Sequence, residues 1–489
     1  MRVVPPRPPD PTDTGVQQRA ADARPNFLLI TLDDAARRDF AYMPHVRRLV
    51  GDAGATMTTM IAPTPVCVPS RASVITGEYA HNHGMLTVGG TYGGADRFVA
   101  RGEQDSTVAT WLDDAGYDTF VTGKWMNGYE RALPASAAQP GWDCWTPATL
   151  GTYRFFDTRF FAPGGRLTGV PGRYSSDQIT DRATTWIAER AADPDPWFGW
   201  INYVAPHNGG PRGPDDPPGL ASTVPAPRDV DSFPRLRMPR DPNLWRRAGL
   251  FGDVRTPPRL RRAEEQLFRE RVQALQAVDR GVRDQIRALR VTGQLDRTYV
   301  VVTSDNGYTT GQQNWLGKIV PYRDILTVPT VVRGPRIPRG SVVTSAAAVP
   351  DLPVTFATLA GAPPEADDAD GADISGLWEG RVAGVRPIPI EGWPKNSDVR
   401  RFEGVVVGRY RYAVRPNGTD QLFDVRTDPF ETVNLAAGAG SDSPLVVRLR
   451  ELTAAYVDCV GTGCPRTYAL GLPFAVPPTE QPTERPTPP

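Results

Sequence analysis

The chain has 489 residues, of which 40% are hydrophobic, and it carries 55 basic and 55 acidic residues, so its formal net charge is zero. This composition is that of a globular protein with room for one large core and a smaller second unit. The balanced charge argues against a nucleic-acid or membrane-surface partner, and no apolar run reaches the length of a transmembrane span.

The two ends of the chain differ in composition from its middle. Residues 1–24 and 471–489 are rich in proline and polar residues, and we expect both to be disordered. Residues 1–24 contain no apolar h-region, so they predict no signal peptide. The compartment stays undetermined, and an exported form is compatible with a trimmed start.

Between these ends, apolar runs alternate with helical patterns, which predicts an α/β fold with a parallel or mixed sheet covered by helices. Four apolar runs are predicted to be buried strands: Phe27–Leu32, Tyr117–Thr122, Trp197–Val204 and Tyr299–Thr303. The clearest helix is expected over Ala263–Val291, where apolar residues recur every three or four positions before Gly293.

A second, smaller unit is predicted near the end of the chain. Residues 363–385 are acidic and contain glycine, so we interpret them as a linker between a main domain at 25–362 and a C-terminal unit at 386–470. Within that unit, Arg409–Val414 alternates with period two and leads through Asn417-Gly418 into Gln421–Val425, which predicts an antiparallel hairpin. The Pro- and Arg-rich stretch Pro211–Pro258 predicts a long irregular insertion of the kind that shapes a substrate cleft.

The four cysteines fall into different settings. Cys459 and Cys464 are close enough to close a small loop, whereas Cys144 has no obvious partner. Cys67 is followed by Val-Pro-Ser-Arg and a short helical run. We therefore expect Cys67 at a helix N-terminus, where free backbone N–H groups favour anions.

Polar residues stand at the carboxyl ends of the four predicted strands, where open α/β sheets bind their ligands. They are Asp33 and Asp34 after the first strand, Lys124 after the second, His207 after the third, and Asp305 and Asn306 after the fourth. Three carboxylates and one amide oxygen form a ligand set suited to calcium, with magnesium as the alternative. Zinc fits less well, because no histidine pairs with cysteine at a zinc-like spacing. We interpret His81-Asn82-His83 as a helix-end turn rather than a metal pair.

Lysine is rare in this chain. Of the 55 basic residues, only Lys124, Lys318 and Lys395 are lysines. A compact ammonium fits where a broad guanidinium does not. Lys124 and Lys318 are therefore predicted to be functional.

Cys67-Val68-Pro69-Ser70-Arg71 resembles the sulfatase signature, in which the cysteine is oxidised to formylglycine. Further stretches similar to that family are Phe27–Asp34, Gly123–Trp125, Ala205–His207, Thr303–Tyr308 and Leu422–Leu435. Gly123–Tyr129 and Thr292–Gln312 look most similar to the N-acetylglucosamine-6-sulfatase branch. The resemblance implies an alkaline-phosphatase-like fold: a large mixed, mostly parallel sheet sandwiched by helices, with a small C-terminal antiparallel sheet.

The resemblance also implies a chemistry, that of a sulfuric ester hydrolase acting on a sulfate monoester of a sugar or glycan. A formylglycine-generating enzyme would convert Cys67, whose hydrated aldehyde attacks sulfur with one hydroxyl and expels sulfate with the other. The implied roles are metal binding by Asp33, Asp34, Asp305, Asn306 and residue 67, charge stabilisation by Arg71, Lys124 and Lys318, and protonation of the leaving oxygen by His207.

One position departs from the family pattern. Many sulfatases carry a histidine two residues after the motif lysine, and here that position is Met126, which cannot transfer a proton. Two alternatives stay open. The chain could be a phosphonate monoester or phosphodiester hydrolase with nearly the same motifs, or a non-catalytic binder of sulfated glycans in which Cys67 stays a thiol.

Overall fold

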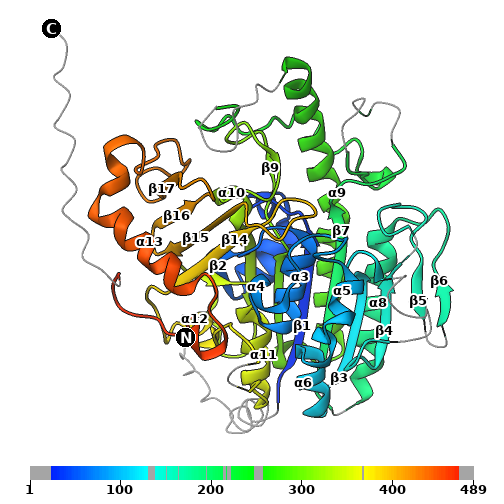
Figure 1. The fold of residues 1–489 in the computed structure, drawn as a ribbon. Coiled ribbons are helices and arrows are strands. Elements are labelled where there is room, and N and C mark those ends of the chain that lie inside the picture. The colour runs from blue at the N-terminus through cyan, green and yellow to red at the C-terminus, as the bar shows by residue number, and fades with distance from the viewer. Residues whose placement is uncertain are drawn as a thin grey trace, which may run out of the picture.

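Five parallel strands form the middle of one large sheet, and one of them is the first strand of the chain, β1 (Asn26–Asp33) (Figure 1). In the computed structural model, the described residues are 24–129, 138–149, 151–162, 165–193, 195–212, 216, 222–246, 257–365 and 368–472. Most of the two terminal segments expected to be disordered, residues 1–23 and 473–489, lies outside the described residues. Among those described, no helix combines the length and the apolar character that crossing a membrane requires.

Within the described residues the large sheet has eleven strands, in agreement with the predicted mixed, mostly parallel α/β architecture. From edge to edge they are β12 (Ser341–Val343), β2 (Ala55–Ile61), β11 (Thr327–Arg333), β8 (Thr298–Ser304), β1 (Asn26–Asp33), β7 (Trp197–Pro206), β3 (Asp118–Lys124), β4 (Cys144–Ala148), β5 (Phe160–Ala162) and β6 (Arg166–Thr168), and β13 (Ala347–Ala348) pairs with β2. The neighbours β8, β1, β7, β3 and β4 are parallel, whereas β11 runs antiparallel to both β8 and β2. The four strands predicted from apolar runs are β1, β3, β7 and β8, and each is confirmed.

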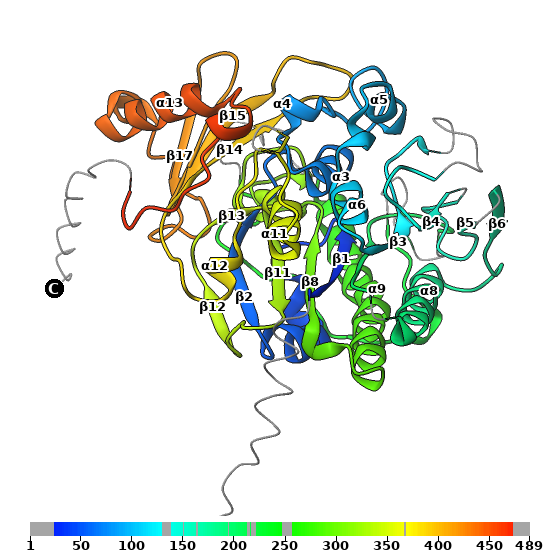
Figure 2. The same cartoon turned by 90° about the horizontal axis from the view of Figure 1, so that it is seen from below.

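Helices cover both faces of the sheet, which explains why the central strands are apolar throughout. Phe27 and Leu29 of β1 pack into one core, and Leu28 and Ile30 pack into the other. The first core also includes residues of α3 (Cys67–Thr76), α5 (Ala95–Ala100), α6 (Val108–Asp114), α11 (Asp351–Ala360) and α12 (Ser375–Trp378). The second includes residues of α2 (Pro44–Val46), α8 (Ser175–Glu189) and α9 (Pro258–Val291). Figure 2 shows α11 and α8 on opposite sides of the sheet.

Helix α9 begins five residues earlier than its apolar periodicity indicates. The pattern predicts Ala263 as the start, whereas the helix starts at Pro258, a residue type that suits the first helical position. Its first turn is mostly exposed and therefore carries no apolar repeat. The predicted helix is confirmed, and the end near Gly293 is as expected, because Gly293 adopts a φ of 70°.

A separate antiparallel sheet follows, as predicted. It consists of β14 (Pro387–Gly392), β15 (Phe402–Val407), β16 (Tyr410–Val414) and β17 (Asp420–Asp424), paired in that order. The predicted hairpin is the β16–β17 pair, in which Val414 lies opposite Asp420. One face of this sheet is covered by α13 (Pro444–Tyr456), and the other packs on Ile61 and Leu326 of the main domain.

The segment 363–385, interpreted as a linker, connects the two sheets but is also packed. It contains α12, and Trp378 in that helix is 1% exposed within the first core. The composition around α12, dominated by Ala, Asp and Gly, hides this packing from a sequence analysis. The element order is completed by α4 (Ala80–His83), α10 (Arg323–Leu326) and the two-stranded ribbon of β9 (Thr309–Thr310) and β10 (Leu316–Gly317).

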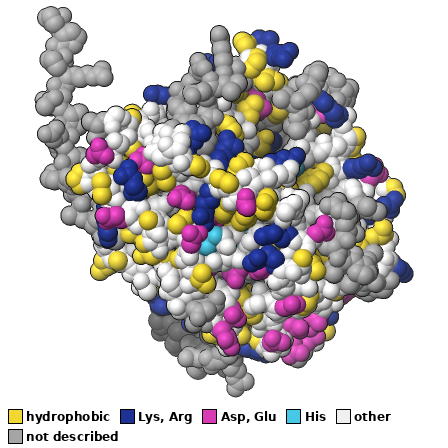
Figure 3. All heavy atoms as spheres, in the orientation of Figure 1, with side chains coloured by type: hydrophobic (Ala, Val, Ile, Leu, Met, Phe, Trp, Pro, Cys, Tyr) yellow, Lys and Arg dark blue, Asp and Glu magenta, His cyan; other side chains and the backbone are white. Residues whose placement is uncertain are grey.

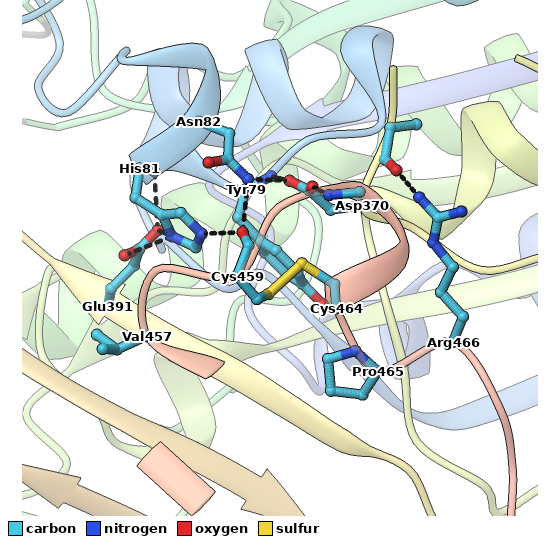
Figure 4. Close-up of a disulfide and its surroundings, with 12 residues drawn as sticks. Tyr79, His81, Asn82, Asp370, Glu391, Val457, Cys459, Cys464, Pro465 and Arg466 are labelled. Carbon is cyan, nitrogen blue, oxygen red and sulfur yellow. Dashed lines mark hydrogen bonds and ion pairs between the residues drawn. A yellow bond between two sulfur atoms is a disulfide. The ribbon is translucent and has the colours of Figure 1, made fainter. Parts of the chain in front are cut away.

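Cys459 and Cys464 form a disulfide, and the loop it closes docks on α4 (Figure 4). The Cys459 carbonyl accepts hydrogen bonds from His81 Nε2 and Asn82 Nδ2, each at 2.8 Å. His81 Nδ1 lies 3.0 Å from Glu391 Oε1, and His83 Nε2 lies 3.0 Å from Ser73 Oγ. The two histidines thus make structural hydrogen bonds with different partners, which agrees with reading this stretch as a helix-end turn. Cys144 is a free cysteine.

A buried ion pair joins α11 to the start of the C-terminal sheet. Asp351 and Arg386 have side chains that are 0% exposed and paired with each other. Asp351 also accepts hydrogen bonds from the N–H groups of Ala348 (2.7 Å) and Ala372 (2.8 Å). A single carboxylate therefore holds three separate segments together.

We expect Asp351→Ala to lower the free energy of unfolding by about 3–5 kcal/mol, because it leaves the Arg386 guanidinium buried without its carboxylate. Urea unfolding followed by circular dichroism measures this loss. Glu451→Ala is the matched control, since it removes an exposed pair with Arg448 (2.9 Å) and should cost less than about 1 kcal/mol. Equally small losses in both variants would contradict the role given to Asp351.

Candidate active site

Six of the predicted polar residues meet at one edge of the large sheet. Because β8, β1, β7 and β3 are parallel neighbours, their carboxyl ends lie side by side. Asp33 and Lys124 are the last residues of β1 and β3, Asp34 follows β1, His207 follows β7, and Asp305 and Asn306 follow β8. Asp34 adopts a φ of 66°, a left-handed conformation that aspartate tolerates better than most residues.

Cys67 reaches this edge from the first position of α3. Its Sγ atom lies 3.5 Å from Asp33 Oδ1 and 2.8 Å from Lys318 Nζ. Burial raises the pKa of the thiol to about 12, although Lys124 and Lys318 oppose the shift. The unmodified side chain is therefore a neutral thiol at pH 7, and a thiolate nucleophile is a poor explanation of the site.

Each of the two predicted lysines pairs with a different carboxylate. Lys124 Nζ lies 2.5 Å from Asp33 Oδ2, and Lys318 Nζ lies 2.5 Å from Asp34 Oδ1. Burial alone would raise the pKa of Asp33, yet His207, Lys124 and other nearby cations hold this pKa far below its usual range. Both lysines are largely buried, with side chains 2% and 16% exposed, whereas Lys395 is exposed.

Arg71 is fully buried one turn after Cys67, and the protein itself occupies most of its donors. Its Nε donates to Asp305 Oδ2 at 2.8 Å, and its Nη1 donates to the Lys124 carbonyl at 3.0 Å and to Asn202 Oδ1 at 2.8 Å. Nη2 is buried and has no acceptor among the described residues. Arg71 thus ties α3 to the ends of β8 and β3 and to the middle of β7, and Nη2 is the donor left for an anion.

The oxygen atoms next to Asp34 fit a divalent cation. The ligand atoms of Asp33, Asp34, Cys67 and His207 all lie within 4.8 Å of one another. Asn306 donates its Nδ2 to Asp34 Oδ1 at 2.7 Å, and its Oδ1 is a buried acceptor with no donor among the residues that the structure describes. A buried carbonyl oxygen beside two carboxylates is an environment that suits a hard cation such as calcium.

Asp305 is not among the residues whose ligand atoms lie within 4.8 Å of one another, and its oxygens already have donors. Oδ1 accepts from the Asp34 N–H at 3.1 Å, and Oδ2 accepts from Arg71. Burial and the charge of Asp33 raise its pKa to about 6, against the effect of Arg71. As a metal ligand, Asp305 would use its remaining lone pairs.

The His207 ring is held at one nitrogen and faces the carboxylates with the other. Its Nδ1 donates to the Asn208 carbonyl at 2.7 Å, and its Nε2 lies 3.7 Å from Asp34 Oδ2. Burial lowers the pKa of the ring, although Asp33 and Asp34 oppose the shift. Because Nδ1 holds the proton of the neutral ring, Nε2 carries a proton only in the imidazolium form, which burial disfavours and the two carboxylates favour.

Tyr153 is a residue that sequence reasoning missed. Its ring centroid lies 5.3 Å from Lys124 Nζ and 4.7 Å from the centroid of the His207 ring, and its hydroxyl lies 3.2 Å from Asn127 Nδ2. With Met126, which is 4% exposed, Tyr153 lines a cavity of about 290 Å³ beside Lys124. Burial raises the pKa of Tyr153, so the hydroxyl stays protonated and does not act as a base.

Two supporting residues were also missed, and both carry a signal in the sequence. Asn202 is a fully buried amide in the otherwise apolar β7 strand. Arg271 lies on the core-facing side of α9, in line with Leu267 and Leu275, and its Nη2 donates to the Asp34 carbonyl at 2.5 Å. Gly123 is required beside Asn202, because a Cβ at position 123 would come within 1.8 Å of the Asn202 carbonyl oxygen.

Comparison with known proteins agrees with this geometry. Residues 25–362 match the family model described as sulfatase. An arylsulfatase of Volvox carteri is 28% identical over 92% of this chain and 77% of its own length. The human N-acetylglucosamine-6-sulfatase is 29% identical over 74% of this chain and 65% of its own length.

A solved structure shares the fold. A protein in complex with its substrate D-glucosamine-2-N,6-O-disulfate superposes with a TM-score of 0.72 at 20% identity, over 88% of this chain and 97% of the other. At that identity the likeness concerns the fold alone.

We expect the purified protein to bind one divalent cation, and Asp34→Ala to remove most of it, because Asp34 is the carboxylate shared by Lys318, Asn306 and His207. Elemental analysis after extensive dialysis measures the metal content. Asp177→Ala is the control, since Asp177 pairs with the exposed Arg228 outside this cluster. Zinc in place of calcium or magnesium, or undiminished metal in the Asp34 variant, would contradict the ligand set.

Proposed function

The chain belongs to the sulfatase family, and from that membership we propose that it hydrolyses a sulfate monoester on a sugar, with formylglycine at residue 67 and a bound divalent cation. The observation that carries the proposal is the position of Cys67 Sγ, 3.5 Å from Asp33 Oδ1 and 2.8 Å from Lys318 Nζ. A buried residue between two carboxylates and a lysine is well placed to present an oxygen nucleophile to an anionic ester.

The neutral thiol supports modification of this cysteine. With a pKa of about 12, the Cys67 thiol offers almost no thiolate at pH 7. A hydrated formylglycine at this position supplies two hydroxyls on one carbon, of which one attacks sulfur and the other expels sulfate while the aldehyde re-forms. The non-catalytic alternative gives no reason for the two buried lysines beside this side chain.

Cations on three elements would stabilise the charge on the transferring group. The Lys318 ammonium lies beside residue 67, and the Lys124 ammonium lies beside Asp33. Arg71 has its Nη2 left to donate to a bound anion. A divalent cation bound by Asp33, Asp34, Asp305 and Asn306 would neutralise further charge on the sulfuryl oxygens. Preorganised cations in a site of low dielectric stabilise a transition state most effectively where its charge develops.

We assign protonation of the leaving oxygen to His207. The Asn208 carbonyl orients the ring, and Nε2 faces the cluster. A sugar alcohol is a poor leaving group, so its departure depends on a proton donor. Tyr153 contacts both the His207 ring and Lys124, and we propose that it positions them.

We propose a sugar substrate, with the sulfate at the 6-position of a glucosamine-type unit. The human relative acts, by its name, as an N-acetylglucosamine-6-sulfatase. Release of inorganic sulfate from glucosamine 6-sulfate, absent in Cys67→Ala, tests the proposal. Turnover of phosphonate esters or of aryl sulfates alone would overturn the substrate assignment, and turnover by Cys67→Ala would overturn the mechanism.

We expect Lys124→Arg and Lys318→Arg each to lower kcat about 100-fold despite conserving charge, because a guanidinium cannot occupy the space of a compact ammonium 2.5 Å from a buried carboxylate. Steady-state kinetics on one substrate measure the loss. The exposed Lys395 provides the matched control, and Lys395→Arg should leave kcat unchanged. Near wild-type rates in both site variants would show that the two lysines are incidental.

We expect His207→Ala to slow cleavage of a sugar sulfate about 100-fold more than cleavage of an activated nitrophenyl sulfate, because nitrophenolate leaves without a proton. The two rates are compared at one pH in the wild type and the variant. Because His207 also lies within the metal-ligand group, metal content is measured in parallel. An equal loss on both substrates, or a loss explained by missing metal, would remove His207 from the proton-donor role.

A further inference from the structure

A second charged hollow lies outside the active site, between residues 237–245 and the first part of α9. We call it the arginine groove. Its volume is about 680 Å³, and five of its eleven lining residues are arginines: Arg237, Arg240, Arg261, Arg262 and Arg269. Figure 3, in the orientation of Figure 1, shows dark-blue basic side chains dispersed over this face of the molecule, some of them near its top.

Of the two carboxylates in the arginine groove, one pairs with an arginine outside the groove and the other pairs with Arg237. Both oxygens of Asp241 lie 2.9 Å from Nη1 of Arg38, which is outside the groove. Glu265 lies 3.8 Å from Arg237, whose side chain is 77% exposed. Within the part of the chain that the structure describes, Arg240, Arg262 and Arg269 pair with no carboxylate. Because the whole chain has zero net charge, the positive charge here is a local excess.

The groove is built directly onto the segment that follows the metal-site residues. The Trp245 N–H donates to the Gly311 carbonyl at 2.8 Å, and the Gln313 N–H donates to the Asn243 carbonyl at 2.8 Å. Residues 311–313 come shortly after Asp305 and Asn306. A smaller hollow is lined by Asp241, which also lines the groove, and by Arg271, whose Nη2 donates to the Asp34 carbonyl. The groove is therefore connected to the active site through the segment 305–313 and through Arg271.

Trp245 lies at this connection in an unusual backbone conformation. Its φ is 58°, a left-handed value that bulky residues rarely adopt. Its ring packs so closely on Gly311 that a Cβ there would come within 2.7 Å of ring carbons, and the Arg261 guanidinium lies 5.4 Å from the ring centroid. The tryptophan thus fixes both the loop and one of the arginines.

We propose that the arginine groove is a second binding site for an anionic sulfated glycan chain, distinct from the site of ester cleavage. Guanidinium groups bind sulfate and carboxylate oxygens through paired hydrogen bonds, and several of them along one groove match the repeated anions of such a chain. The choice of a glycan over another polyanion rests on the proposed function, because the groove adjoins the site that would cleave a sugar sulfate.

The test measures binding without turnover, in the Cys67→Ala background. In that background Arg240, Arg262 and Arg269 are all changed to Gln, and the control changes Arg287, Arg290 and Arg339, which lie away from the groove, to Gln. The probes are dextran sulfate oligosaccharides and single-stranded oligothymidylate of similar length and charge, at about 0.15 M salt. We expect the groove variant to bind dextran sulfate at least tenfold more weakly than the control, since three charge contacts to the polyanion are lost together.

The proposal would be overturned if the groove variant and the control variant bound dextran sulfate equally. If the protein with the unmodified groove bound oligothymidylate as tightly as dextran sulfate, the glycan assignment would be overturned in favour of a nucleic acid. Hydrolysis of a small aryl sulfate, measured with Cys67 intact, should be the same in both triple variants. Because binding is read without catalysis, failure of the groove and failure of the proposed function are separate results.

Discussion

Two adjacent buried carboxylates at the end of β1 are the constraint on which the rest of the active site depends. Asp33 is 0% exposed and Asp34 is 1% exposed, and each buried charge costs several kcal/mol unless cations and donors surround it. The compensating groups come from β3 (Lys124), from the residue after β10 (Lys318) and from the residue after β7 (His207). Because these elements are far apart in sequence, the site is complete only when the whole sheet edge has assembled.

Much of this edge could be predicted from sequence, because the side-chain types and the strand ends are local features. Asp33, Lys124 and Asp305 follow short apolar runs that predict buried strands, and parallel strands align their carboxyl ends. Packing contacts between distant segments could not be predicted in the same way. Tyr153 lies in a stretch without a clear pattern, and only the assembled fold brings its ring to Lys124 and His207.

Two features of α9 that the sequence analysis did not predict have identifiable causes. Arg271 interrupts the apolar face of α9, and a charged residue on a core-facing stripe indicates a buried partner, here the Asp34 carbonyl. The early start of α9 at Pro258 was missed because an exposed first turn carries no apolar repeat. The apolar periodicity that predicts a helix reports neither the contacts of its polar residues nor the extent of its exposed first turn.

The chain uses its two kinds of cation differently at the two charged hollows. Two lysines lie beside the active-site cluster around residue 67, which has room only for a compact cation. Arginines line the groove outside the active site, where a broad planar guanidinium can bind an extended anion. In a chain with 55 basic residues and three lysines, this separation follows from the geometry of the ligands rather than from net charge.

The central claim is that residue 67 acts as formylglycine and not as cysteine. A peptide mass spectrum that covers Cys67, taken on preparations made with and without a formylglycine-generating enzyme, measures the converted fraction directly. The account predicts that the rate of sulfate release rises in proportion to that fraction and vanishes where the peptide carries only the thiol. Full activity in a preparation whose peptide is entirely unmodified cysteine would contradict it.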